Sequence, residues 1–224
     1  MFRPPETTAI PSAKPRLRGL SHGVAFFLAL PLGAVLSVKA PTALGRASAI
    51  VFGASVAAMF GASALYHRVS WSPRPRRWMR RLDHTGIYVL IAGTYTPFGL
   101  LVLRGSWSIA VLAIVWSGAA AAIALRFLWV EAPEWLSALI GVALGWVGVV
   151  VFPQVLAEIG LGPSLLVVAG GLAYTAGAVI YALRRPDPFP TVFGFHELFH
   201  VCVIAAVACH YAAIAFWVLP ERPS

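Results

Sequence analysis

Apolar residues gather in seven blocks of the chain, separated by short stretches that hold most of the charged residues. A helix needs about 20 apolar residues to cross the hydrocarbon core of a bilayer. The pattern therefore predicts an all-α membrane protein, a seven-transmembrane helix bundle at 19–219 with a short tail at each end (1–18 and 220–224). The predicted spans are residues 20–38, 48–67, 83–103, 107–127, 135–152, 163–183 and 193–219.

Composition agrees with a single membrane domain. Hydrophobic residues make up 59% of the chain and charged residues only 11%, whereas a soluble domain carries about 25% charged residues. The net charge of +9 does not indicate a nucleic-acid partner, because membrane proteins collect basic residues in their cytoplasmic loops. No protein partner is predictable from the sequence. We expect the basic, proline-rich residues 1–18 to be a disordered tail.

Lysine and arginine are distributed unevenly between the two sides of the predicted bundle. If the N-terminus is cytoplasmic, thirteen of these residues lie inside and four outside, and the largest group falls in the loop 68–81. Because basic residues are retained in the cytoplasm during insertion, we predict a cytoplasmic N-terminus and an extracytoplasmic tail at 220–224.

A few ionisable residues lie at the ends of the apolar blocks. Such residues are costly to place near lipid, so each is a candidate for a functional site. His67 ends the second block, Asp83 opens the third, and His196 and His200 open the seventh. The predicted topology brings all four to the cytoplasmic boundary.

Two other histidines are expected to be hydrogen-bonded packing residues. His22 opens the first block. His210 follows His200 by ten residues, which is about 15 Å deeper along a helix. That depth removes His210 as a ligand for an ion at the boundary.

The spacing of the boundary residues predicts a zinc site. His196 and His200 are four residues apart and lie on one face of a helix, so both can reach one ion. Together with His67 they offer three imidazoles and leave a fourth position for water, as in catalytic zinc sites. Asp83 can orient that water or a ligand, and Ser63 lies one helical turn before His67.

The stretch HELFH at 196–200 also matches the H-E-x-x-H pattern of zinc proteases, in which the glutamate is the general base. Glu197 is expected to face loop arginines or lipid headgroups.

Three motifs resemble the progestin and adipoQ receptor family, whose bacterial branch is named hemolysin III. They are S-x-x-x-H at 63–67, L-D-x-x-G-I at 82–87, with LIAGTYTPF following, and H-x-x-x-H-V at 196–201. A further histidine follows ten residues later. The resemblance covers essentially the whole chain, and it implies a multi-pass protein of a bacterial plasma membrane with its N-terminus inside.

The same resemblance implies zinc held by His67, His196 and His200, with Asp83 contacting a zinc-bound water. The wider superfamily includes alkaline ceramidases, so a membrane lipid is the expected substrate or ligand. In the adiponectin receptors the position that matches Glu197 is glutamine, so the family's chemistry does not need a carboxylate there.

Four functional hypotheses follow. The first is a zinc-dependent hydrolase of lipid amides or esters at the cytoplasmic leaflet, in which Asp83 relays the proton and Ser63 donates a hydrogen bond. The second is a lipid-sensing receptor or a regulator of membrane state, with structural zinc. The third is an intramembrane zinc protease, and the fourth is a pore-forming cytolysin.

Overall fold

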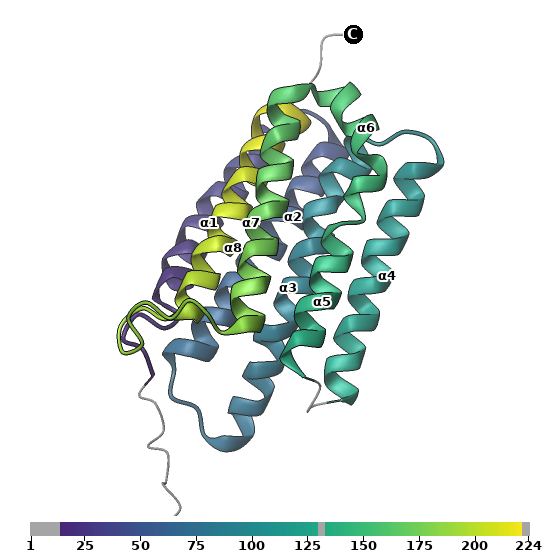
Figure 1. The fold of residues 1–224 in the computed structure, drawn as a ribbon. Helices are drawn as coiled ribbons and strands as arrows, with labels where there is room; N and C mark the ends of the chain where they lie inside the picture. The colour runs from purple at the N-terminus through teal and green to yellow at the C-terminus, as the bar shows by residue number, and fades with distance from the viewer. Residues whose placement is uncertain (1–13, 130–132, 221–224) are drawn as a thin grey trace, which may run out of the picture.

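The chain folds into helices that lie side by side in one elongated bundle (Figure 1). A computed structural model describes residues 14–129 and 133–220, so residues 1–13 of the predicted N-terminal tail and 221–224 of the C-terminal tail lie outside the described residues. The helices are α1 (Leu20–Lys39), α2 (Ala43–Arg68), α3 (Pro73–Leu101), α4 (Ser106–Leu128), α5 (Glu134–Gly145), α6 (Gly148–Ile159), α7 (Leu161–Leu183) and α8 (Phe195–Ala213), which continues as the π-helical turn Ile214–Val218.

The prediction of an all-α membrane protein is confirmed. Within residues 14–129 and 133–220, six helical stretches are long and apolar enough to cross a membrane: α1, α2, α4, α5 with α6, α7, and α8 with its π-helical turn. Helix α3 is more polar, and it packs against α2 and α4 with a fully buried middle around Leu90 and Ala92. The count of seven spans and the cytoplasmic N-terminus stay predictions.

Helix α3 begins earlier than expected. Residues 68–81 were predicted as a loop, but only residues 69–72 separate α2 from α3. Pro73 occupies the first turn of α3, where its missing N–H and fixed φ are favourable. The guanidinium of Arg81 lies 4.9 Å from the centre of the Trp78 ring. Five of the six arginines at 68–81 therefore stand on α3, which extends past its neighbours (Figure 1).

The predicted span 135–152 is two helices. The helix is interrupted between Gly145 and Gly148, inside an otherwise apolar stretch. The Tyr95 hydroxyl of α3 bridges the interruption. It donates to the Gly145 carbonyl at 2.6 Å and accepts from the Gly148 amide at 2.6 Å. An interruption in a membrane helix needs such partners, because lipid cannot satisfy the freed backbone groups.

Glycines let α1 approach α2 closely. A Cβ added at Gly33 would lie 3.3 Å from the Cα of Gly53, so this crossing depends on two residues without side chains. Small residues at helix interfaces are typical of membrane bundles. Phe27 and Val38 of α1 are 71% and 80% exposed, as expected for side chains that face lipid.

Part of the N-terminal tail is ordered, contrary to expectation. The Arg16 and Leu17 amides donate to the carbonyls of Thr191 and Val192, at 3.0 and 3.1 Å. These bonds attach residues 14–18, which we call the strap, to the connection between α7 and α8. The prediction of disorder is therefore wrong for the strap, because its backbone has partners in another loop.

Candidate metal site

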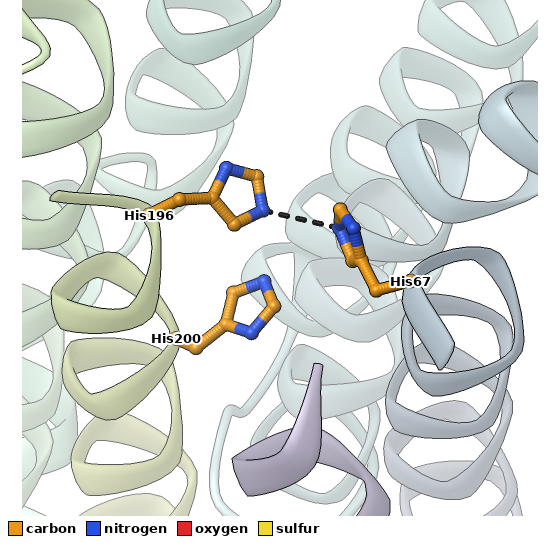
Figure 2. Close-up of side chains that lie close together, drawn as sticks. All are labelled: His67, His196 and His200. Carbon is orange, nitrogen blue, oxygen red and sulfur yellow. Dashed lines mark hydrogen bonds between the residues drawn. The ribbon is translucent and has the colours of Figure 1, made fainter. Parts of the chain in front are cut away.

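Three histidine side chains meet at the end of the bundle where the strap lies. His67 comes from the last turn of α2, and His196 and His200 come from the first two turns of α8 (Figure 2). One ring nitrogen from each can be chosen so that all lie within 4.8 Å of one another. The Nε2 atoms of His67 and His196 are 3.1 Å apart. This separation requires a proton on one of them or a cation between them.

Asp83 lies beside this cluster. Its Oδ2 is 3.6 Å from His67 Nε2 and also 3.6 Å from His84 Nδ1. Because Asp83 is in α3, the cluster joins side chains from three helices. The structure thus brings together the four residues that the sequence singled out, and the three histidines could hold a metal ion.

His22, predicted to be a packing residue, belongs to the same cluster. Its ring stacks on that of His200, with centroids 3.6 Å apart and planes 8° apart. Its Nδ1 lies 2.9 Å from the hydroxyl of Ser63. His22 is therefore a fourth imidazole of the cluster, itself buried, and its Nδ1 orients the Ser63 hydroxyl. The apolar pattern of α1 does not reveal which of its residues face α8, so this contact could not be predicted from the sequence.

The first turn of α8 is fixed by two carboxylates. Glu197 Oε2 accepts from the Gly194 amide at 2.8 Å, and Asp187 Oδ1 accepts from the Phe195 amide at 2.9 Å. A helix N-terminus leaves such amides without partners inside the helix, and negative groups there are favourable. These bonds hold the backbone on which His196 stands.

The strap bonds to both helices that carry the three histidines. Arg18 Nε donates to Glu197 Oε1, and Lys14 Nζ donates to the carbonyl of His67. Partial burial and the charges of Arg18 and Arg68 lower the pKa of Lys14. The expectation for Glu197 is corrected here: its partner is an arginine of the strap, and its side chain is buried away from headgroups. Both of its oxygens are engaged.

Gly19 allows the strap to lead into α1 at this place. Its φ is +78°, and a Cβ at this position would collide with the Cβ of His67. A left-handed backbone without a side chain is therefore required next to the histidine cluster. The turn lets α1 start against the end of α2, and this brings His22 to His200.

One elongated cavity of about 260 Å³ opens from the cluster into the bundle. Ser63, Asp83 and His196 line it at the cluster, and Phe98 and Val155 line it further along. About 22 Å of helix separate Asp83 from Phe98. Most of the lining side chains are apolar, so the cavity is suited to a hydrocarbon chain whose polar end lies at the histidines.

His210 makes the hydrogen bond expected of a packing residue. Its Nε2 lies 3.1 Å from the carbonyl of Val167, and its side chain is buried. The structure adds that His210 lines the deep part of the cavity.

Comparison with known families can now be set beside this geometry. A family model described as "Haemolysin-III related" matches residues 12–211, which include the strap and every histidine of the cluster. The chain belongs to this family. Family membership and the six apolar helices together establish a multi-pass integral membrane protein.

Two bacterial relatives are similar to this chain over most of their length, and a plant relative is similar over a shorter part. Hemolysin-3 of Bacillus cereus is 34% identical over 206 residues, 90% of each chain. The Hemolysin-3 homolog of Bacillus subtilis (strain 168) is 30% identical over 202 residues, 88% of this chain and 91% of that protein. Heptahelical transmembrane protein ADIPOR1 of Oryza sativa subsp. japonica is 33% identical over 167 residues, 67% of this chain and 44% of that protein.

Proposed function

We propose that this haemolysin-III-related protein is a zinc-dependent hydrolase of lipid amides or esters, acting at the cytoplasmic leaflet. The observation that carries the proposal is the connection between a cluster of histidines that could hold a metal ion and a long apolar cavity. A lipid chain in this cavity would bring its amide or ester carbonyl to the histidines.

The donor set fits zinc. Imidazole nitrogens suit Zn²⁺, and three of them leave a coordination position open. His200 Nδ1 is buried and has no hydrogen-bond partner among residues 14–129 and 133–220. A buried polar atom without a partner costs on the order of 1–3 kcal/mol, and coordination would remove that cost at one of the cluster's imidazoles.

Zinc bound at the histidines would supply a Lewis acid and a water of lowered pKa. In this proposal Asp83 accepts a proton from the attacking water and passes it to the leaving group. Ser63 donates a hydrogen bond to the substrate carbonyl, while His22 donates from Nδ1 to the Ser63 oxygen. The strap keeps bulk water from the reacting groups.

Of two alternatives, the geometry weakens the first and supports the second. A protease of the H-E-x-x-H type needs the Glu197 carboxylate as a base, but its oxygens are bound to Arg18 and to the Gly194 amide. A lipid-sensing regulator with structural zinc is favoured by the ligand set itself, because a metal shared by His67 and His196 would tie α2 to α8.

The test uses purified protein and a membrane lipid extract. We expect one zinc per chain in the wild type, almost none in His67→Ala, and full zinc in the control Cys209→Ala, which alters α8 away from the cluster. Asp83→Asn should retain zinc and lose lipid turnover, measured by mass spectrometry of released fatty acids. Turnover at the wild-type rate in Asp83→Asn would overturn the mechanism. Full zinc in His67→Ala would overturn the site.

A further inference from the structure

The deep part of the cavity carries two polar side chains that the proposed chemistry does not use. Tyr174 of α7 and His210 of α8 both line it, and their ring centroids are 5.7 Å apart. His210 is only 7% exposed. Its bond to the Val167 carbonyl fixes the tautomer, because a carbonyl oxygen can only accept. The hydrogen is on Nε2, and Nδ1 is left as an acceptor.

Two buried polar atoms of this pair of side chains have no hydrogen-bond partner among the described residues. The Tyr174 hydroxyl and His210 Nδ1 are buried and make no hydrogen bond to any residue that the structure describes. Buried polar side-chain atoms almost always have a partner in the protein, a bound water or a ligand. Two such atoms on neighbouring side chains of one cavity therefore indicate that a group bound in the cavity is their hydrogen-bond partner.

The chemistry of the bound group follows from the two atoms that it would contact. The Tyr174 hydroxyl can donate, and His210 Nδ1 can accept, so one ligand hydroxyl can satisfy both atoms at once. We propose that Tyr174 and His210 form a subsite that binds a hydroxyl group on the hydrocarbon chain of the lipid. The subsite rests on the proposed function only in taking a lipid chain as the occupant of the cavity.

The depth of the subsite sets the position of that hydroxyl. His210 follows His200 by ten residues on α8, which corresponds to about 15 Å along the helix. An extended chain advances roughly 1.2 Å per bond, so about twelve bonds separate the polar end from the hydroxyl. A hydroxyl about two-thirds of the way along an eighteen-carbon acyl chain, near the twelfth carbon, matches this depth.

The test compares two fatty acids that differ in this hydroxyl alone. Purified wild-type protein in detergent is titrated with octadecanoate and with 12-hydroxyoctadecanoate, using displacement of a fluorescent fatty acid as the readout. Each well-made hydrogen bond is worth about a 3- to 10-fold change in affinity. We expect the hydroxylated acid to bind at least about 5-fold tighter.

Two variants assign the preference to the subsite. Tyr174→Phe removes only the hydroxyl and should abolish the preference while octadecanoate binds as in the wild type. Tyr211→Phe is the matched control, because Tyr211 bonds to the Leu32 carbonyl outside this cavity, and it should keep the preference. Equal binding of the two acids by the wild type, or a preference that survives in Tyr174→Phe, would overturn the subsite.

Binding is measured without turnover, so the two proposals can fail separately. A preference lost in Tyr174→Phe, in a protein that hydrolyses no lipid, would support the subsite and reject the hydrolase. Turnover of lipids with no binding of either acid would reject the subsite alone.

Discussion

The ion pair between the strap and α8 gives the sharpest test of the structure. Arg18→Met removes the cation and leaves the Glu197 side chain, which is 2% exposed, bonded to the Gly194 amide alone among the described contacts of its carboxylate. Glu197→Gln removes the charge instead. Its amide oxygen can still accept from Gly194, and the Arg18 side chain, 18% exposed, can turn to solvent.

The two single variants should therefore differ in stability. A buried ion pair that loses one partner costs about 3–5 kcal/mol, and we expect the lower value, about 3 kcal/mol, for Arg18→Met because the pair lies at the end of the bundle. Glu197→Gln should cost about 1 kcal/mol, since one hydrogen bond changes. The double variant should resemble Glu197→Gln alone, because no unpaired buried charge remains.

Thermal unfolding in detergent, followed by circular dichroism, measures these differences. For a chain of this size 1 kcal/mol shifts Tm by about 2–4 °C, so Arg18→Met should lower Tm by roughly 6–12 °C. Arg16→Met is the control, since Arg16 contacts the α7–α8 connection through its backbone amide. If Glu197→Gln proves the more destabilising, or if the two changes add in the double variant, the pair is not buried as described. Loss of all hydrolytic activity in Glu197→Gln would support the protease hypothesis, in which Glu197 is the general base.

Two further predictions concern single hydrogen bonds. His22→Phe keeps a ring against His200 but removes the hydrogen bond to Ser63. We expect unchanged zinc content and about tenfold slower lipid turnover, equivalent to one hydrogen bond of about 1.4 kcal/mol. Loss of zinc in this variant would instead make His22 a ligand. Tyr95→Phe deprives the Gly145 carbonyl and the Gly148 amide of their partner and should lower stability by about 2 kcal/mol, measured by thermal unfolding; an unchanged Tm would mean that the α5–α6 break is satisfied in another way.

Hydropathy predicts the helices well but their ends poorly. The start of α3 was missed because PRPRRWMRR has the composition of a loop, although Pro73 is compatible with a first helical turn. The break between α5 and α6 was missed for the opposite reason. Residues 145–148 read GWVG, which is apolar throughout, and the partner that stabilises the break is Tyr95 of another helix.

The candidate site was partly accessible from the sequence because depth and spacing are local properties. A residue's position within an apolar block gives its depth, and the i,i+4 spacing of His196 and His200 gives a shared face. His22 was missed because α1 is apolar on all sides. In such a helix the pattern does not say which face meets protein and which meets lipid.

By itself the sequence determined the class of the protein, the approximate helices, and the residues able to bind a metal, because these depend on composition and on short-range spacing. Only the tertiary structure decided which helices meet. Gly19 brings α1 against His67, the strap pairs Arg18 with Glu197, and α7 and α8 set Tyr174 beside His210. These contacts join residues far apart in the chain, and they depend on the rotation of each helix about its axis, which side-chain packing fixes.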